Sequence, residues 1–558
     1  MSTSTLPTTE SILTRGYFPR ELPPTFSTKS FGHYVGSQSA LPFTTTGDDY
    51  RLSRPEVFNL ARAGSLRREL SILNPIHYAA LVDHVVQNWA DLISITTSRI
   101  SLTIPTPTES GRAISRGQSL EQLPRGRARV RSIGTHILFA DVARFYPSIY
   151  THAVSWAIHT KSVAKAAFRS RTRLMGDRLD TLLRNCQDAQ SVGIPIGPDV
   201  SLLLAEILLS RVDEVLGGAG IRGIRYIDDY ELVFESERDA LKAKSVLQSA
   251  LLEYELDLNA SKTRIVPLPQ ELEESWVGSL RAVKLKPYSN HFEKQLIRFF
   301  DHAFQLSKEF PNEGVLKYAA GRIAKLPIHL TGSDELIENL LIQCAQVEPG
   351  ALAVVLGSIL KRPSVSAETQ RLRSRMLLRI ILDAAPQRHS SEVAWALWAC
   401  LVLGVELNRE ATQAIVSMED SVCALLALHA KEEGLVREPK DLAPLRDDLD
   451  GAALYSPKWM LAYEAPRKGW FRFTGARDYI ANDPNFSLLK GAGVFFYDKQ
   501  KAVIPDNLVG TQRASFVDEY VSGLTETDYD SEDDEEDYWD DEEEYDSLRD
   551  GDPLTEPE

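Results

Sequence analysis

The sequence predicts an α+β fold in roughly the first 285 residues, followed by an all-helical half. Two apolar, β-branched segments lead into carboxylates: one strand ends at Asp141, and residues 224–234 form a hairpin with Asp228 and Asp229 at its turn. The order strand, helices, hairpin, helix, strand is that of a ferredoxin-like β-α-β-β-α-β sheet. From about residue 290 onward, apolar residues recur with helical periodicity.

Length and composition describe a chain of several folded domains. At 558 residues it can form roughly two to four of them. No apolar run approaches the roughly 20 residues that cross a bilayer, and the N-terminus lacks the apolar core of a secretion signal, so we expect a cytoplasmic protein without a membrane partner. The cysteines are scattered, which fits a reducing compartment and argues against structural zinc: Cys186, Cys344, Cys400 and Cys423.

The net charge of −16 comes from one end of the chain. Residues 526–558 hold 19 acidic residues and one arginine, a net of −18, so the remainder carries about +2. This near-neutral body is compatible with a nucleic-acid ligand. The acidic tail cannot fold by itself, and we predict that it is disordered from residue 521. It either competes with nucleic acid for a basic groove or serves solubility.

Residues 1–60 are predicted to be an extended N-terminal arm. Prolines hold residues 16–26 in an extended conformation, and the aromatic residues there would be costly to leave in water. We therefore expect this segment to pack across a domain surface, with an ordinary tethered arm as the alternative.

Three basic stretches follow the arm. Arg67 and Arg68 precede a helical pattern over 78–95, and they suit either phosphate contact or a solvated helix end. Residues 105–132 read as a polar loop that is either a footprint for a polyanion or a plain surface loop. Its arginines are Arg112, Arg116, Arg125, Arg127, Arg129 and Arg131. The helical segment after Asp141 adds Lys161, Lys165, Arg169, Arg171, Arg173, Arg178 and Arg184.

Asp141, Asp228 and Asp229 are the candidate catalytic carboxylates. An unpaired carboxylate at the end of a buried strand is costly, and two adjacent carboxylates repel each other unless a cation neutralises them. In a β-α-β-β-α-β sheet the two Asp-bearing strands can be neighbours, so the three groups converge. Such a set suits two divalent ions, Mg²⁺ or Mn²⁺, with substrate phosphates as further ligands. A solvated hairpin turn is the alternative for Asp228 and Asp229 alone.

Other segments complete this pattern. Residues 193–201 form a Gly/Pro loop that opens a long apolar helix over 202–216, where free N–H groups could meet an anion. An amphipathic helix over 237–254 precedes a strand that begins near Lys262.

The second half is predicted to consist of helices joined by short polar connections, as in stacked helix pairs. A HEAT-like solenoid is one such arrangement, although no fixed-period repeat is visible. The predicted helices are 292–306, 314–326, 334–346, 350–360, 368–384, 392–403 and 409–435. Residues 459–497 are rich in aromatic and basic residues, which fits either stacking on bases or an end cap that packs on helices.

The segments 139–146, 193–201, 226–229 and 258–263 resemble, in this order, motifs A, B, C and D of reverse transcriptases. The resemblance covers roughly residues 60–285. It implies a right-hand polymerase with fingers over 61–135 and a palm over 136–285, followed by the helical domain over 286–455 and the aromatic, basic segment over 456–520. The activity implied is RNA-directed DNA polymerisation, a nucleotidyl transfer.

The resemblance also implies roles for single residues. Asp141 and Asp228 would be the main metal ligands, Asp229 the third catalytic carboxylate and the Val142 carbonyl an extra ligand. The nucleotide would meet Tyr146, which rejects a 2′-hydroxyl, together with Arg67 or Arg68, Gly197 and Lys262, a candidate proton donor to pyrophosphate. Tyr226 and Ile227 complete motif C, and Trp276 would begin the primer grip.

Finer features resemble the bacterial antiphage reverse transcriptases of the abortive-infection and defence-associated types. They are residues 16–24, 67–72 and 144–152, with the helical second half. Motif B departs from the usual Pro-Gln-Gly, because Ile196 stands in place of the glutamine. This change and the family together imply synthesis that is template-independent, protein-primed or both.

The implied partners are dNTPs, a DNA product, a non-coding RNA, and a homo-oligomer or a second defence protein in a bacterial cytoplasm. One alternative is a retron-type or intron-type enzyme that copies a dedicated RNA. The other is a nucleic-acid-binding scaffold with a vestigial palm.

Overall fold

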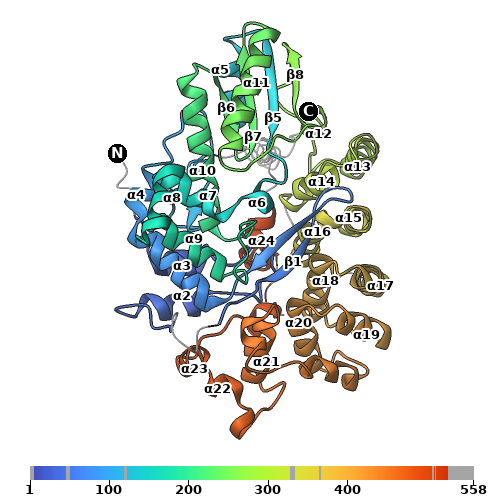
Figure 1. The fold of residues 1–558 in the computed structure, drawn as a ribbon. Coiled ribbons are helices and arrows are strands. Elements are labelled where there is room, and N and C mark those ends of the chain that lie inside the picture. The colour runs from blue at the N-terminus through green and yellow to red at the C-terminus, as the bar shows by residue number, and fades with distance from the viewer. Residues whose placement is uncertain are drawn as a thin grey trace, which may run out of the picture.

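The computed structural model describes residues 6–44, 51–118, 122–326, 333–362, 366–505, 508 and 510–525. The first part of the chain forms a small antiparallel sheet with helices packed around it, at the top and left of Figure 1. Helices of the second half form a column on the right, and a hairpin of the N-terminal region reaches between the two parts. None of the described helices is long and apolar enough to cross a membrane.

The N-terminal region is more helical than its prolines predict. Its elements are α1 (Thr9–Arg15), α2 (Lys29–Gly36), β1 (Glu56–Ala61), β2 (Arg67–Ile72), α3 (Pro75–Gln87) and α4 (Trp89–Ile93). The extended arm is therefore interrupted by two helices. As predicted, its aromatic segment is buried, with Tyr17, Phe18 and Phe26 at most 8% exposed. The single helix predicted over 78–95 is wrong, because Asn88 bonds back to the His84 carbonyl and closes α3.

The basic segment 105–132 is not a loop throughout. It contains β3 (Thr106–Pro107), β4 (Ile114–Ser115) and α5 (Leu123–Arg131). A proline in the first turn starts α5, since that position needs no N–H donor. The loop prediction is therefore wrong over its last third.

The sheet has the predicted strand order. It contains β5 (His136–Asp141), β6 (Arg222–Tyr226), β7 (Asp229–Phe234) and β8 (Arg264–Pro267). The spatial order is β6-β7-β5-β8 and each pair is antiparallel, as in a β-α-β-β-α-β arrangement. The two Asp-bearing strands β5 and β7 are hydrogen-bonded neighbours. Lys262 lies in the turn before β8 rather than in the strand.

Helices pack on this sheet and beside it. They are α6 (Phe145–Ser148), α7 (Thr151–His159), α8 (Lys161–Ser170), α9 (Met175–Asn185), α10 (Asp199–Gly218) and α11 (Glu237–Leu252). Helix α11 contacts β5, β7 and β8. Helix α10 is buried along most of its length, which explains its nearly continuous apolar sequence.

The second half forms two layers of helices, as the periodicity predicted. Its elements are α12 (Ser275–Arg281), α13 (Phe292–Glu309), α14 (Val315–Ala324), α15 (Asp334–Val347), α16 (Leu352–Lys361), α17 (Ala367–Ala384), α18 (Ser390–Leu403), α19 (Arg409–Ser417) and α20 (Ser421–Glu432). Successive odd-numbered helices from α13 to α17 contact each other, and so do successive even-numbered ones from α14 to α20. The single helix predicted over 409–435 is wrong, because Asp420 caps a new helix by accepting from the Cys423 N–H.

The C-terminal aromatic segment packs into the core. It contains α21 (Trp459–Arg467), α22 (Tyr479–Asn482), α23 (Phe486–Gly491) and α24 (Gly510–Thr525). Short 3-10 helices lie at Pro349–Ala351, Ala385–Gln387, Pro439–Arg446, Ala453–Tyr455, Gly475–Arg477 and Lys499–Ala502. Trp459, Tyr463 and Tyr497 are fully buried, which confirms the end-cap interpretation. The base-stacking alternative is wrong for these rings, since no face is free. The tail was predicted to be disordered from residue 521, which is wrong for residues 521–525 because α24 continues to Thr525. Residues 526–558 lie outside the described residues.

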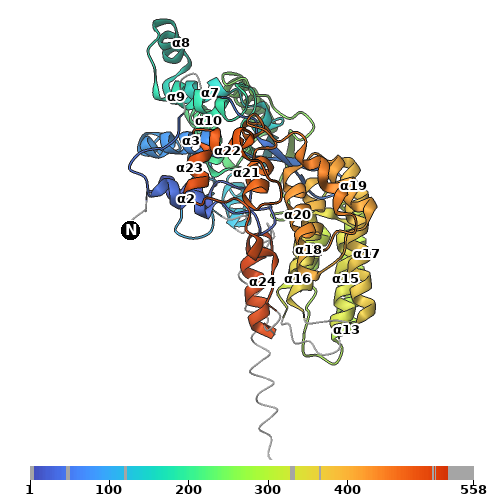
Figure 2. The same ribbon diagram turned by 90° about the horizontal axis from the view of Figure 1, so that it is seen from below.

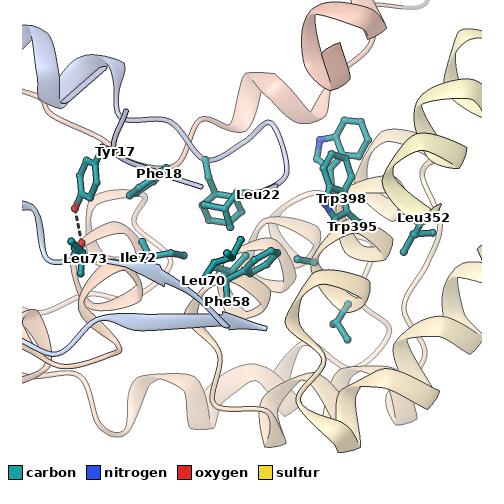
Figure 3. Close-up of a cluster of buried hydrophobic side chains, with 14 of the residues drawn as sticks. Tyr17, Phe18, Leu22, Phe58, Leu70, Ile72, Leu73, Leu352, Trp395 and Trp398 are labelled. Atoms are coloured by element: carbon teal, nitrogen blue, oxygen red, sulfur yellow. Dashed lines mark hydrogen bonds between the residues drawn. The ribbon is translucent and has the colours of Figure 1, made fainter. Parts of the chain in front are cut away.

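A shared apolar core joins the two halves (Figure 3). Tyr17 and Phe18 of the arm lie beside β2, where the Tyr17 hydroxyl donates to the Leu73 carbonyl over 2.5 Å. Phe58 and Leu70 of the β1–β2 hairpin face the same cluster, which Trp395 of α18 reaches from the helical half. The hairpin is therefore held between the arm and α18.

Candidate active site

Pairing of β5 with β7 brings the predicted carboxylates together. Asp141 and Asp229 are directly opposite in the ladder, and Tyr226 pairs with Asp229 across the hairpin. Asp228 occupies the turn between them. The side chain of Asp229 also lies within hydrogen-bond reach of Asp141. Asp141 thus meets Asp228 and Asp229, which lie nearly 90 residues later in the chain, at one end of the two central strands.

The hairpin turn has a strained backbone, which hydrogen bonds to neighbouring side chains stabilise. Ile227 has a φ of 56°, a left-handed conformation that is unfavourable for a β-branched residue. Its N–H donates to Thr103 Oγ1 over 3.2 Å, and its carbonyl accepts from Arg225 Nη1 over 2.7 Å. Arg225 is fully buried between Glu206 and Asp213 of α10, at 2.8 and 2.6 Å. This ion-pair network fixes where the Asp228 carboxylate points.

The carboxylates repel each other at close range, with Asp141 buried, Asp228 half-buried and Asp229 exposed. Burial and the charge of Asp141 raise the pKa of Asp228 to about 6. Burial and the charges of Asp228 and Asp141 raise the pKa of Asp229 to about 7. A bound cation would relieve both effects, because an opposite charge favours the ionised form.

Lys262 and Asn259 hold Asp141. Lys262 Nζ lies 2.8 Å from Asp141 Oδ2, and Asn259 Nδ2 donates to Asp141 Oδ1 over 2.8 Å. Burial opposes the charge of Lys262, but its hydrogen bond to Asp141 and the nearby carboxylates outweigh this and raise its pKa. Asn259 was missed by the sequence prediction, although its place in the turn before Lys262 suits an Asx residue.

The donor set fits a divalent cation by chemistry. Oxygen ligands from closely spaced carboxylates are those that Mg²⁺ prefers, and the raised pKa values of Asp228 and Asp229 indicate uncompensated negative charge. No three acidic, histidine or cysteine side chains within the described ranges already form a closed metal-binding group. Asp141 is instead neutralised by Lys262, which a cation would displace.

A cleft of about 1500 Å³ opens in front of these carboxylates. Asp141, Val142 and Asp228 line one wall of it. The N-terminal arm contributes Arg20, and the helical half contributes Lys325. The cleft is therefore built from both halves of the chain, beyond the sheet that carries the carboxylates.

Tyr146 and Arg68 face Asp228 inside this cleft. Burial and the charge of Asp228 raise the pKa of the Tyr146 hydroxyl. Burial and the neighbouring Arg62 lower the pKa of Arg68, whereas the charge of Asp228 acts in the opposite direction. The structure brings these two predicted nucleotide-binding residues into one place.

Arg67 has different surroundings from its neighbour. Its Nη1 and Nη2 contact Glu392 of α18 at 2.5 and 3.0 Å, and its Nε donates to Asn59 over 2.9 Å. Its guanidinium thus ties the β1–β2 hairpin to the helical half. Glu392 was not predicted, since nothing in the sequence connects residues 325 positions apart.

The motif B loop is clamped by an arginine. Gly197 has a φ of 122°, and a Cβ there would lie 2.9 Å from Pro19 of the arm, so only glycine fits. Arg112 donates to the carbonyls of Gly197 and Phe18, at 2.8 and 2.6 Å, and to Asp199. The polyanion interpretation of Arg112 is thus wrong, because three internal acceptors occupy it.

Tyr226 and Trp276, two other predicted site residues, contact side chains of the protein itself. The Tyr226 hydroxyl accepts from Arg116 Nη1 over 3.1 Å at the mouth of the cleft. Trp276 is fully buried and meets the Tyr318 ring edge to face at 5.6 Å, so it packs in the core where the helical half begins.

Residues 91–307 match the family model described as reverse transcriptase (RNA-dependent DNA polymerase). The chain carries a reverse transcriptase domain. Its enzyme class is that of the RNA-directed DNA polymerases, which are nucleotidyltransferases, as the motifs predicted. Such a domain has the right-hand polymerase fold and acts on nucleotides and nucleic acid with divalent metal ions. The matched range contains Asp141, Asp228, Asp229 and Lys262, and it excludes the hairpin with Arg67 and Arg68.

Other comparisons add little. No curated protein sequence matches the chain. Among solved structures, the chain is similar to apo telomerase from Candida tropicalis at 11% sequence identity, over 74% of this chain and 71% of that chain. The TM-score is 0.30, and at this value the similarity adds nothing to the fold described above.

Proposed function

We propose that the reverse transcriptase domain polymerises dNTPs at the end of the central strands β5 and β7, where Asp141, Asp228 and Asp229 meet. The convergence of these carboxylates, with raised pKa values for the two at the hairpin, is the observation that carries the proposal. It also argues against the vestigial scaffold, because an unused palm has no need for mutually repelling acids held by a strained turn.

The carboxylates would hold two divalent ions, Mg²⁺ or Mn²⁺, with the Val142 carbonyl as a further ligand. When bound, such ions activate the attacking hydroxyl and stabilise the charge of the leaving pyrophosphate. Asn259 keeps the Asp141 side chain oriented toward the cleft, since it donates to the Oδ1 atom.

In the reaction, the 3′-hydroxyl of the primer loses its proton to solvent water in the open cleft, and its oxygen forms a bond to the α-phosphorus of the nucleotide. The bond from that phosphorus to the pyrophosphate oxygen breaks. Lys262, which is protonated beside Asp141, would give a proton to the pyrophosphate. Tyr146 would lie against the sugar and exclude a 2′-hydroxyl, while Arg68 would contact the triphosphate. Gly197 allows the loop to approach this nucleotide without a side chain.

Substitution of one carboxylate tests the proposal. Asp228→Asn keeps the shape of the side chain and removes its charge, so we expect incorporation of dNTPs to fall by at least about 10³-fold. Asp239→Asn on the exposed face of α11 is the matched control and should leave incorporation unchanged. Incorporation by Asp228→Asn at the wild-type rate, with Mg²⁺ or Mn²⁺, would refute the assignment.

The adjacent arginines allow a second test. Arg68→Ala should raise KM for dNTPs by about tenfold or more with little effect on thermal stability, since it removes one charge-assisted phosphate contact. Arg67→Ala should lower the thermal midpoint instead, because it removes the arginine from the buried Glu392 and leaves it only the contacts to Ser391 and His389. The opposite pattern would assign the triphosphate contact to Arg67.

We further propose that the enzyme acts in antiphage defence and that synthesis needs no nucleic-acid template. The support is the resemblance of residues 16–24, 67–72 and 144–152 to defence-associated enzymes, and Ile196 in place of the motif B glutamine. Purified protein, given Mg²⁺ and each dNTP without template, should yield a product whose sequence reflects nucleotide choice. Removal of that product by protease would indicate priming from the protein.

A product that matches a dedicated RNA would favour the retron-type or intron-type alternative. Cells that express the chain should resist phage plating, and Asp228→Asn should abolish the resistance. For the helical half we propose a HEAT-like solenoid, supported by its two layers of helices. That the chain forms a homo-oligomer or binds a second defence protein stays a prediction.

A further inference from the structure

Helix α8 projects from the body of the molecule (Figure 2). It follows α7 and packs on it, and its buried face consists of small side chains, Ala164 and Ala167. Together with the three residues after it, α8 forms a segment, residues 161–173, that we call the basic knob. The residues that flank α8 both have positive φ angles, 74° at Thr160 and 57° at Arg171.

Within the described residues, Lys161 at the start of the basic knob pairs with Glu255 over 3.2 Å, whereas the arginines at its far end have no ion-pair partner. The sequence contains no Asp or Glu between Asp141 and Asp177. Arg169, Arg171 and Arg173 are exposed, and no ion pair engages them within the described part of the chain. An acid-free group of arginines on a projecting element presents positive charge to a partner outside the protein.

An aromatic ring stands among these cations. The Phe168 side chain is 84% exposed, the highest value among the large apolar residues of the described ranges. It directly precedes Arg169 and lies on the same short helix as Lys165, whose Nζ lies 6.0 Å from the Trp156 ring centroid. An exposed ring flanked by cations is the combination that single-stranded nucleic acid uses, with a base on the ring and phosphates on the cations.

The knob also lies within reach of the cleft. Tyr146 and Pro147 line the cleft, and the chain continues from them into α7. The nine residues of α7 extend about 14 Å and lead to the start of α8, so a single strand of several nucleotides can reach from the cleft to the knob.

We propose that the basic knob binds the single-stranded segment of nucleic acid that extends from the cleft. Phe168 stacks on an unpaired base, and Arg169, Arg171 and Arg173 contact the flanking phosphates. A duplex offers no free base face to Phe168, so the knob distinguishes single strands from duplex. The contact does not depend on base sequence, because each base has a face to stack.

Binding of labelled oligonucleotides to the full chain tests this proposal. Fluorescence anisotropy without nucleotides would compare 20-mers of oligo(dT) and oligo(U) with a 20-base-pair duplex, so the result is independent of the proposed catalysis. Phe168→Ala should weaken binding of the single strands about tenfold and leave the duplex unchanged. Replacing the three arginines by Ala should lower the slope of log K against log salt by about 2.

Matched variants separate this contact from general effects. Val347→Ala removes another exposed apolar side chain, at 72% exposure. A triple substitution of Arg371, Arg375 and Arg379 to Ala removes exposed arginines from one face of α17. Neither should change single-strand affinity, and thermal midpoints should stay within a few degrees throughout.

Three outcomes would overturn the proposal. An equal loss in the α17 variant would mean that only net charge matters. An equal loss on duplex with Phe168→Ala would exclude stacking on an unpaired base. Unchanged oligonucleotide binding, with self-association lost in light scattering, would make the knob a contact between copies of this chain. A difference between the oligo(dT) and oligo(U) arms shows whether product or template chemistry is preferred.

Discussion

Two segments rich in arginine differ in where their side chains lie: some arginines of the first segment pair with acids inside the protein, and those of the second face solvent. Between Arg112 and Arg131, three of the six arginines turn inward: Arg112 pairs with Asp199, and Arg127 and Arg131 pair with Glu231. In the basic knob, Arg169, Arg171 and Arg173 face solvent. The acids that neutralise the first group come from α10 and β7, about 90 to 100 residues later in the chain. The number of basic residues in a segment therefore does not by itself indicate an external anionic partner. It does so only where the folded protein places no acidic side chains beside them.

The largest effect is expected from Arg112→Ala. This change leaves the buried Asp199 carboxylate without its ion pair and should cost about 3 kcal/mol of unfolding free energy. Urea denaturation measures the loss, and Arg125→Ala on the exposed side of α5 is the control. If Arg112→Ala lost no more unfolding free energy than Arg125→Ala, the ion-paired arginine would contribute no more to stability than the exposed one.

The cost of Arg112→Ala should depend on pH. Burial raises the pKa of Asp199, and Arg112 partly counteracts this. Without Arg112 the folded-state pKa rises further above that of the unfolded chain. Below the folded-state pKa, Asp199 is protonated, and the variant does not bury an unpaired charge. As the pH rises through that pKa, Asp199 ionises and the cost of burying its charge appears. The destabilisation should therefore be larger at pH 8 than at pH 5. A pH-independent cost would mean that Asp199 stays charged in the variant.

An intermediate effect is expected where two arginines share one acid. Arg127 Nε and Arg131 Nη2 contact the two carboxylate oxygens of Glu231 at 2.5 and 2.7 Å. Each single change to Ala should cost about 1–2 kcal/mol, since the other arginine remains. The double variant should lose more than the sum, because only then is Glu231 unpaired. Additive losses in a double-mutant cycle would contradict a shared site.

The smallest effect on stability is expected in the basic knob. Arg169→Ala removes an exposed side chain that has no ion partner among the described residues, and it should change the unfolding free energy by less than about 0.5 kcal/mol. The same change should weaken the binding of single strands. A loss of stability comparable to that of Arg112→Ala would show that the two segments do not differ in the way described.

Much of the site could be predicted because it depends on local pattern. The strand into Asp141, the hairpin around Asp228 and Asp229, and the order of the sheet follow from alternating apolar residues and turn chemistry. Predicted helices fail where one side chain redirects the backbone, as at Asn88 and Asp420. Periodicity averages over a segment and cannot detect a single cap.

The contacts of individual charged residues could not be predicted. Arg67 and Arg68 are adjacent and alike, yet alternation along β2 sends one to Glu392 and the other toward Asp228. Trp276 and the aromatic residues of the C-terminal segment suggested contacts with nucleic acid, and burial shows that they pack in the core. Exposure depends on neighbours that are distant in sequence.

The sequence by itself determined the carboxylate set, the hairpin that carries two of its members, and the reverse transcriptase class that these residues imply. It could do so because strand alternation and turn preference act within a few residues. Only the tertiary structure decided that Arg112, Arg127 and Arg131 are held internally, and that Glu392 binds Arg67 while Arg68 faces Asp228. It also decided that α8 projects with Phe168 exposed. Whether each of these side chains is paired, buried or exposed depends on an opposite charge or an apolar surface from a segment that is distant in the sequence. Tertiary packing determines whether that segment lies beside it.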